Sequence, residues 1–314
     1  MKGKFSRKWE LWAFLAPALI VVLLFYVVPL ILTVYTSFTP LRNWNIQRYA
    51  TRLVGLYNYQ KLFHAITNDP SVRAVFLTTA VFVLCTLTVN VLGGLILALL
   101  TFFVDKKTNF VASTVWLLPR MSPIAVYGLV WYYFFHGSRV GTLNSIFLKL
   151  GLIDRPIAWG QEFVPYGPWS VIVFVNGLVG VSFGMIVLSS AIKSIPGEFV
   201  IAARVDGATD WQICRKVLIP QIKWHIMYVT TWQLLSLLTS YAHTYLLVSW
   251  RLVNKSYGTP WALYVYDLAF TGVFDQGLAA AAGTLLVLVG GLLGLMTLRI
   301  LGFGKLMVEP RGDI

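Results

Sequence analysis

The segment IPGEFVIAARVDGATDWQICRKVLIP, residues 195–220, is the one long stretch of the sequence that mixes acids, bases and apolar residues at helical spacing. On both sides of it the chain is almost continuous hydrocarbon. The chain has 314 residues, of which 58% are hydrophobic and 12% are charged, whereas a soluble domain carries about 25% charged residues. So much apolar surface does not fit inside one water-soluble core, and the composition therefore predicts an integral membrane protein.

Six stretches are long and apolar enough to span a bilayer, which takes about 20 residues of helix. They are too long and alternate too little to be barrel strands, so we expect an all-α fold with six transmembrane helices. The predicted spans are residues 11–38, 74–104, 110–135, 169–192, 226–250 and 278–301. The first apolar run is longer than that of a secretory signal and no small-residue cleavage site follows it. We interpret residues 1–38 as an uncleaved N-terminal membrane helix.

The distribution of basic residues indicates the topology. Six spans place both termini on one side, and the loops on that side carry 14 Lys and Arg against 10 on the other, with Arg120 inside a span. The bias has the sign of the positive-inside rule. We therefore expect a multi-pass protein of the cell membrane (inner or plasma membrane) with both termini in the cytoplasm. Basic loops that meet anionic lipid account for the net charge of +13, so no nucleic-acid partner is expected.

The sequence carries no motif typical of catalysis. There is no phosphate-binding loop, no H-E-x-x-H, no paired-cysteine motif and no G-x-S-x-G. We expect no catalytic residue, no metal and no cofactor, and interpret the chain as a conduit or carrier, not an enzyme. An ion-coupled secondary carrier is the alternative from another class. It would need interrupted helices with intramembrane acids, and no predicted span has a central Asp or Glu.

The charged segment predicts two short helices with a turn between them. Pro196 suits a helix start, and Glu198 lies in the first turn, where the helix dipole favours an acid. Gly207 is expected to break this helix, and a second helix then runs to Pro220. From spacing alone, an ordinary amphipathic interfacial loop is an equally open interpretation.

The residues of this segment resemble the cytoplasmic signature of ATP-binding-cassette (ABC) import permeases, in which Glu-Ala-Ala is followed by Asp-Gly-Ala and later by Leu-Pro. The matching positions are Ala202, Ala203, Asp206, Gly207, Ala208 and Pro220. Ile201 stands where the family has its glutamate. Other segments are similar to the maltose-type subfamily, which imports oligosaccharides and related polyols: GLYNYQKLF, LLPRMSPIAVYGLVW, GTLNSIFLKLGL and YVYDLAFTGVFDQGLAAAAGTLL.

The resemblance implies a type I ABC importer permease fold, a single transmembrane domain over residues 1–314 with a core at about 70–303. It implies that residues 193–225 form a cytoplasmic coupling segment that docks on a separate ATPase. The implied partners are a second homologous permease, two ABC ATPase subunits, an extracytoplasmic solute-binding protein, a carbohydrate substrate and membrane lipid. Glycerol-3-phosphate or another polyol is the alternative substrate. The implied mechanism is alternating access driven by ATP.

The residues expected to couple to the ATPase are Ala202, Ala203, Arg204, Asp206, Gly207 and Ala208. Because Ile201 replaces the family glutamate, we expect Asp206, Arg204 or Arg215 to supply the polar contact instead.

Two sets of residues in the spans are expected to contact substrate. Asn176, Gly180 and Phe183 share one face of the fourth span, and the resemblance places them at sugar-contacting positions that read Asn, Gly and Tyr in the maltose permease. A second stripe in the fifth span consists of Gln233, Ser236, Leu237, Ser240 and Tyr241. The alternative for both sets is hydrogen bonding between helices.

Three further features of the spans have a structural and a functional interpretation. Arg120 lies between Pro119 and Pro123, and an intramembrane charge is a functional hypothesis, although it is equally suited to bond carbonyls freed by the prolines. The run GGLLG, residues 290–294, predicts a close-packing face. His243 is expected to be an interior or interfacial histidine.

Overall fold

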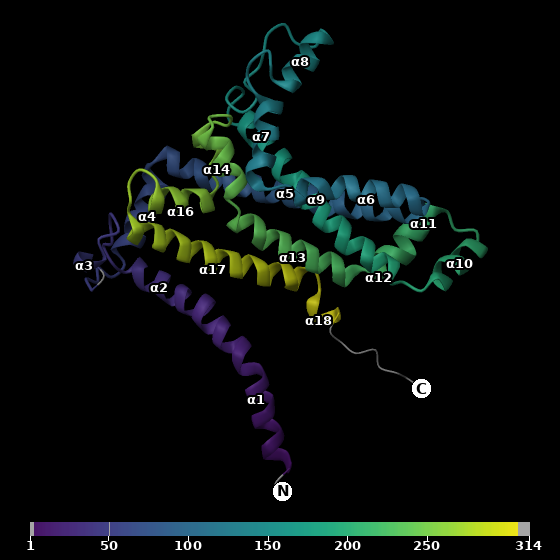
Figure 1. Ribbon diagram of the computed structural model, residues 1–314, viewed down its shortest axis with the longest axis horizontal. Coiled ribbons are helices and arrows are strands. Elements are labelled where there is room, and N and C mark those ends of the chain that lie inside the picture. Colours follow the sequence, from purple (N-terminus) through teal and green to yellow (C-terminus); the bar gives the residue numbers. More distant parts are fainter. Residues whose placement is uncertain (1–2, 50, 307–314) are drawn as a thin grey trace. The chain divides into compact units, whose positions relative to one another are not determined.

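The structure is a computed structural model that describes residues 3–49 and 51–306 (Figure 1). Helices and no strands occur in these residues, which confirms the all-α prediction. The chain divides into two compact units, which we describe separately. The first unit is Met1–Asp69 with Val265–Val287, and the second is Pro70–Tyr264 with Leu288–Ile314.

The first unit begins with the N-terminal span, drawn in purple in Figure 1. The span consists of α1 (Gly3–Val22), the π-helical turn η1 (Leu23–Val27) and α2 (Val28–Ser37). Its most apolar window is 0% buried inside the chain. Within the first unit, this window of the helix therefore remains available to lipid or to another subunit. The short helices α3 (Ile46–Tyr49) and α4 (Tyr57–Asn68) follow.

Both π-helical turns of the described chain precede a proline by the same spacing. In η1 the Val28 N–H bonds to the Leu23 carbonyl, and Pro29 follows. In η2 (Cys214–Leu218) the Ile219 N–H bonds to the Cys214 carbonyl, and Pro220 follows. A proline has no N–H for the carbonyl four residues earlier and its ring clashes with that carbonyl. The helix accommodates this by widening one turn instead of breaking.

A buried carboxylate organises the rest of the first unit. The side chain of Asp275 is 2% exposed and forms ion pairs with Lys61 at 2.6 Å and Arg42 at 3.0 Å. Its other oxygen accepts the Leu278 N–H at 3.1 Å, and so caps α17 (Gln276–Ile300). One acid thereby joins α4, the chain that follows α2, and the start of α17.

The second unit is built around two long helices, α5 (Pro70–Phe103) and α9 (Tyr166–Lys193), which lie along one another in Figure 1. Glycines allow their backbones to touch, since a Cβ added at Gly94 would come within 2.8 Å of the Gly184 Cα. Helix α6 (Lys106–Met121) packs on α9, and α13 (Lys223–Thr239) packs on both long helices. Small residues at helix contacts are typical of membrane helix packing.

The second half of α17 confirms the predicted close-packing face. A Cβ at Gly290 would lie 3.7 Å from Leu238, and one at Gly294 would lie 3.3 Å from Leu235, both in α13. A Cβ at Gly291, between them, meets nothing within 4 Å. The two outer glycines therefore mark the face that contacts α13.

Four of the six predicted spans are single helices long and apolar enough to cross a membrane. They are Trp12–Ser37, Pro70–Phe103, Tyr166–Lys193 and Gln276–Ile300. The third and fifth predicted spans, by contrast, are each interrupted, so six continuous helices are not what the structure shows. The third divides into α6 and α7 (Ile124–Phe135), and the fifth divides into α13 and α14 (Ala242–Ser249).

The interruption of the third span has a clear cause. Pro123 disfavours the helical conformation at the preceding residue, and Ser122 is extended, with φ −71° and ψ 137°. In the fifth span Ser240 is extended in the same way. The Thr239 hydroxyl there donates to the carbonyls of Leu235 and Ser236, and such hydroxyls compete with the backbone for helical hydrogen bonds.

The connections also contain short helices. They are α8 (Thr142–Lys149), α10 (Gly197–Val205), α11 (Asp210–Ile213), α12 (Ile219–Gln221), α15 (Lys255–Gly258), α16 (Trp261–Phe270) and α18 (Phe303–Leu306). The loop around α8 is organised by Asn144, which is fully buried. Its amide donates to the carbonyls of His136, Ser138 and Ile157, and its oxygen accepts the backbone N–H of Ile157 and the indole N–H of Trp159.

Candidate transport pathway and coupling segment

The charged segment folds as two helices joined by a glycine turn, as its sequence predicts. Helix α10 begins after Pro196 with Glu198 in its first turn, and Gly207 follows it with φ 78°. The Ala208 N–H bonds to the Ala203 carbonyl at 2.9 Å, and the Gly207 N–H bonds to the Arg204 carbonyl at 3.0 Å. This pair of bonds is a Schellman motif, which needs a left-handed residue at its turn.

The second helix of the segment begins with a capping box. The Gln212 N–H donates to the Thr209 hydroxyl at 3.3 Å, and the Thr209 N–H donates to the Gln212 side-chain oxygen at 2.8 Å. The T-x-x-Q spacing of a capping box is readable in the sequence. Only Ala208 separates this box from the glycine turn, so the two helices are held by adjacent local bonds.

An apolar cluster anchors the segment to the long helices. Buried Ile213, Leu218 and Ile222 pack in one cluster with residues of α5, α9 and α13: Ala98, Leu188, Ala191, Ile192 and Val229. Cys214 belongs to the same cluster. Burial raises the pKa of the Cys214 thiol, and the nearby Asp210 carboxylate adds to this. Cys214 is therefore a packing residue and not a reactive thiolate.

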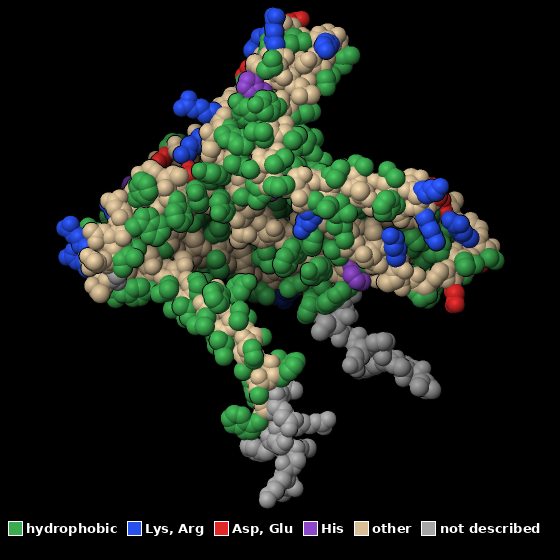
Figure 2. All heavy atoms as spheres, in the orientation of Figure 1, with side chains coloured by type: hydrophobic (Ala, Val, Ile, Leu, Met, Phe, Trp, Pro, Cys, Tyr) green, Lys and Arg blue, Asp and Glu red, His purple; other side chains and the backbone are tan. Residues whose placement is uncertain are grey.

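The outer surface of the segment is partly apolar. Ile201 is 64% exposed, Val205 is 82% exposed and Trp211 is 70% exposed, while Lys and Arg side chains gather around the same end of the second unit in Figure 2. Of the residues predicted to couple to an ATPase, Ala202, Arg204, Asp206 and Gly207 are exposed, and Ala203 and Ala208 are half-buried. Arg204 lies 3.4 Å from Asp210, and both side chains are exposed.

The predicted substrate residues of the fourth span do not all face the same environment. Asn176 is buried, and its amide donates to the Ile172 carbonyl one turn earlier. Gly180 is buried against α5, where an added Cβ would overlap the Asn90 side chain. Phe183 is half-buried, and the Arg120 guanidinium lies over its ring, 5.0 Å from the centroid.

A polar contact joins three helices around Gly180. The Gln233 side chain in α13 donates to the Gly180 carbonyl of α9 at 2.8 Å. The side-chain amides of Gln233 and of Asn90 in α5 lie 3.1 Å apart. All three residues are buried, so Gly180 and Gln233 bond between helices. Asn90 is not among the residues predicted from the sequence, although an asparagine within an apolar span is itself a signal of such a contact.

The predicted stripe of the fifth span is not a continuous helix face. Ser236 is exposed and Leu237 is buried. Helix α13 ends at Thr239, so Ser240 and Tyr241 lie in the break before α14. Ser240 is half-buried and Tyr241 is exposed. The expectation that all five residues share one helical stripe is wrong, because the hydroxyl-rich sequence at 239–240 ends the helix.

His243 contributes to packing across the two interrupted spans. Its ring lies 5.6 Å from the Tyr127 ring, and the Tyr127 hydroxyl donates to the Val175 carbonyl at 2.7 Å. The side chain of His243 is half-buried. The contact brings α7 and α14, the segments after each break, against one another.

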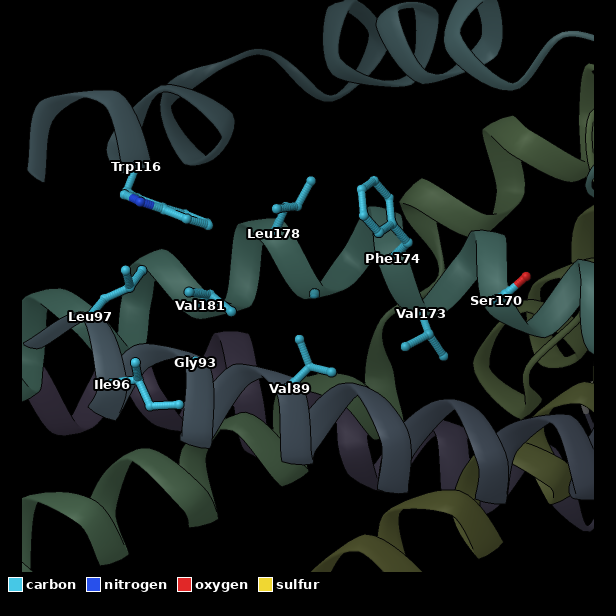
Figure 3. Close-up of a pocket in the computed structure, with 11 residues that line it drawn as sticks. Val89, Gly93, Ile96, Leu97, Trp116, Ser170, Val173, Phe174, Leu178 and Val181 are labelled. Carbon is cyan, nitrogen blue, oxygen red and sulfur yellow. The ribbon is translucent and has the colours of Figure 1, made fainter. Parts of the chain in front are cut away.

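A groove of about 530 Å³ lies between α5, α6 and α9 (Figure 3). Its lining includes Trp116, Phe174 and Leu178, and none of the predicted substrate residues. A sugar site needs several aimed hydrogen-bonding groups, and here only Ser170 and the Trp116 indole carry polar side-chain atoms. The groove is therefore suited to bind an apolar group and not a carbohydrate.

Membrane-length helices, two interrupted spans and an exposed segment of two helices joined by a glycine turn define a multi-span membrane protein. Residues 90–306 match the family described as binding-protein-dependent transport system inner membrane component, and the chain belongs to that family. The chain is 29% identical to the osmoprotective compounds uptake permease protein GgtC of Synechocystis sp. over 224 residues, 69% of this chain and 74% of that protein.

Two further comparisons cover more of the chain. It is 27% identical to the alpha-glucoside transport system permease protein AglF of Rhizobium meliloti over 285 residues, 88% of this chain and 78% of that protein. The fold is that of a chain in a bacterial ABC transporter involved in the import of the acidic polysaccharide alginate. That match has a TM-score of 0.76 at 23% identity and covers 97% of this chain and 98% of that one.

Proposed function

We propose that the chain is a permease subunit of an ATP-driven ABC importer and lines the membrane pathway for a carbohydrate. The observation that carries this proposal is the exposed segment α10–Gly207–α11, which lies within the family match at residues 90–306. The similarity to an alpha-glucoside permease supports a carbohydrate substrate. An ion-coupled secondary carrier is not favoured, because the family is defined by dependence on a binding protein.

In this proposal the chain performs no covalent chemistry. Two separate ATPase subunits hydrolyse ATP, a second homologous permease completes the pathway, and an extracytoplasmic binding protein delivers the substrate. The exposed residues Ile201, Val205 and Trp211 give an ATPase an apolar surface, and burial of apolar area stabilises a complex. Arg204, Asp206 and Arg215 are exposed and supply polar contacts at its rim.

The structure of the segment suits transmission of movement. The Schellman motif and the capping box hold α10 and α11 together, and the apolar cluster joins them to the adjoining ends of the long helices. Close-packed apolar contacts transmit displacement because they leave little free volume. Closure of the ATPases would therefore move α5, α9 and α13 together and switch the pathway between inward-facing and outward-facing states.

We place both termini and residues 193–225 in the cytoplasm, from the distribution of Lys and Arg. Labelling of single cysteines in intact cells tests this topology, in a background without the exposed Cys85 and the buried Cys214. A cysteine at Gln212 should resist an impermeant reagent, whereas one at Arg139, in the opposite loop, should react. Labelling of Gln212→Cys from outside would refute the topology.

The predicted substrate residues divide by exposure into two groups. Phe183, Ser236, Ser240 and Tyr241 are at least partly exposed, and we place them along the pathway. Asn176, Gly180, Gln233 and Leu237 are buried and support the pathway from behind. Asn176→Ala and Phe183→Ala therefore have different expected effects: Phe183→Ala should raise the substrate concentration for half-maximal uptake, and Asn176→Ala should lower the stability of the complex.

Reconstitution of the whole importer tests the proposal. The chain is combined in proteoliposomes with the second permease, the ATPases and the binding protein of its importer, and uptake of labelled maltodextrins and other oligosaccharides is measured. Uptake should require ATP, the binding protein and this chain. Gly207→Trp should leave the complex assembled and abolish uptake. Uptake that follows an ion gradient and is indifferent to ATP would refute the proposal in favour of a secondary carrier.

A further inference from the structure

Arg120 is a cation in the middle of a predicted span. It lies in the last turn of α6, ahead of the break at Ser122, and its side chain is exposed. With the described residues its guanidinium makes no hydrogen bond and no ion pair, and its contact is the face of the Phe183 ring at 5.0 Å. An ionised side chain inside a membrane is costly without a partner and is typically functional.

The chain itself offers no anion to Arg120 within the spans. All 12 Asp and Glu residues lie outside the six predicted spans. The guanidinium also does not take the alternative role of bonding a carbonyl freed by the prolines, since it donates to no carbonyl of the described residues. The Leu118 carbonyl beside the break accepts the backbone N–H and the hydroxyl of Ser122, at 3.1 and 2.9 Å. The five N–H donors of the guanidinium are therefore available to a group from outside the described residues.

Phe183 positions this cation at the proposed pathway. A cation over an aromatic face is held by the ring quadrupole, and the planar guanidinium keeps its edge donors free when it lies on a ring. Phe183 has no hydroxyl of its own to bond a substrate, so Arg120 is the hydrogen-bond donor at this position. Its donors fit two oxygens of a carboxylate or a phosphate at once.

We propose that Arg120 recognises an anionic group of the substrate, so that the imported carbohydrate is acidic and not neutral. The inference rests on the proposed function, since it names the substrate class of the same pathway. The ligand chemistry is an oxyanion, either a uronate carboxylate or a sugar phosphate. Phe183 is the aromatic platform that orients Arg120, and Arg120 is the specificity-determining residue.

The test compares matched acidic and neutral substrates in the reconstituted importer. Vesicles of phosphatidylcholine alone exclude anionic lipid headgroups. Binding-protein-stimulated ATPase activity and uptake are measured with oligogalacturonate, galactose 1-phosphate and neutral galacto-oligosaccharide, for the wild type, Arg120→Gln, Arg120→Lys and Arg139→Gln. Arg139 is an exposed loop residue and serves as the charge-matched control. Size-exclusion chromatography establishes that each complex assembles.

We expect the wild type to prefer an acidic substrate. Arg120→Gln should raise the concentration of acidic substrate needed for half-maximal uptake by about tenfold or more, because a hydrogen bond to a charged group is lost. Arg120→Lys should retain part of the preference and Arg139→Gln all of it. If the importer carries a neutral carbohydrate and Arg120→Gln has no effect, the inference is wrong while the proposed function stands. Equal loss for acidic and neutral substrates also overturns it. If no carbohydrate is imported at all, the proposed function itself fails.

Discussion

Replacement of Gly180 by alanine tests whether the buried polar residues of α9 hold the helices together or line a pocket. The added methyl group would overlap the side chain of Asn90. Asn90 lies 3.1 Å from the Gln233 amide, which in turn donates to the Gly180 carbonyl at 2.8 Å. The substitution therefore displaces Asn90 and disturbs the polar contact that joins α5, α9 and α13 around Gly180.

The magnitude follows from two contributions. Hydrogen bonds between membrane helices contribute on average about 0.6 and at most about 1.7 kcal/mol, and an extra methyl in a packed interior costs about 1–3 kcal/mol. Both apply here, since Asn90 and Gln233 are buried and the Gly180 site has no free space. We expect Gly180→Ala to lower the stability of the assembled importer by about 2–5 kcal/mol.

Thermal unfolding of the purified complex measures this effect, with Gly291→Ala as the matched control. Gly291 is also a helix glycine, and an added Cβ there meets nothing within 4 Å. The control should be as stable as the wild type or slightly more so, because alanine is the better helix former. A double-mutant cycle with Asn90→Ala should show that Gly180→Ala costs less once Asn90 is absent. If Gly180→Ala is as stable as Gly291→Ala and instead weakens substrate affinity, Gly180 lines the pocket and our interpretation is wrong.

Three further predictions concern the coupling segment and the loop around α8. Gly207→Ala should cost about 1–2 kcal/mol locally, because φ is positive there. It should lower uptake per ATP, whereas Gly197→Ala, at a site equally open but without positive φ, should not; equal effects would contradict the assigned turn. The Ala158 N–H and the Arg155 guanidinium lower the pKa of Glu162 from its ordinary value of 4.5, so its stabilisation of residues 136–165 is present above pH 4.5 and is lost as the pH falls through the folded pKa. The protection of this loop against hydrogen exchange, taken relative to the intrinsic exchange rate at each pH, should therefore fall below pH 4.5 in the wild type and show no such step in Glu162→Gln. Asn144→Ala removes five hydrogen bonds of a fully buried side chain and should destabilise the loop by about 3 kcal/mol or more. Limited proteolysis should then cut the variant within residues 136–165. If Asn144→Ala resists proteolysis as well as the control Asn68→Ala, at an exposed helix end, Asn144 does not organise the loop.

The parts of the fold that the sequence predicted depend on composition and on local backbone chemistry. A long apolar run indicates a membrane span whatever other helices it packs against. The positive φ of Gly207 depends only on glycine itself and on the residues next to it in the sequence. The interruption at Pro123 was also readable, since proline restricts the residue before it. Its effect on the third span was missed because hydropathy continues across the break.

The inter-helix contacts were beyond the sequence because they depend on what lies opposite. Asn90 is one asparagine in an apolar run, and its role follows only from the approach of α5 to Gly180 and Gln233. Asn144 likewise bonds the carbonyls of His136 and Ile157, and the loop sequence between these residues has no hydrophobic periodicity from which the bonds could be predicted. The same limit explains the fifth span, where hydroxyl side chains end α13 at Thr239 although the apolar pattern runs on.

The exposure of polar residues in the spans and of apolar residues in the coupling segment indicates where other molecules bind this chain. Asn90 and Gln233 are buried and bonded within the chain, so they contribute to its own stability. Arg120 is polar, exposed and without a hydrogen bond to the described residues, while Val205 is apolar and exposed in a polar segment. A charge inside an apolar span and an apolar side chain exposed to water are both unfavourable in the isolated chain. Binding of an anion to the charge, or of an apolar surface to the apolar side chain, removes that unfavourable free energy. We therefore expect substrate to act at Arg120 and the ATPase at Val205, with the apolar cluster around Leu218 as the physical link between coupling segment and long helices.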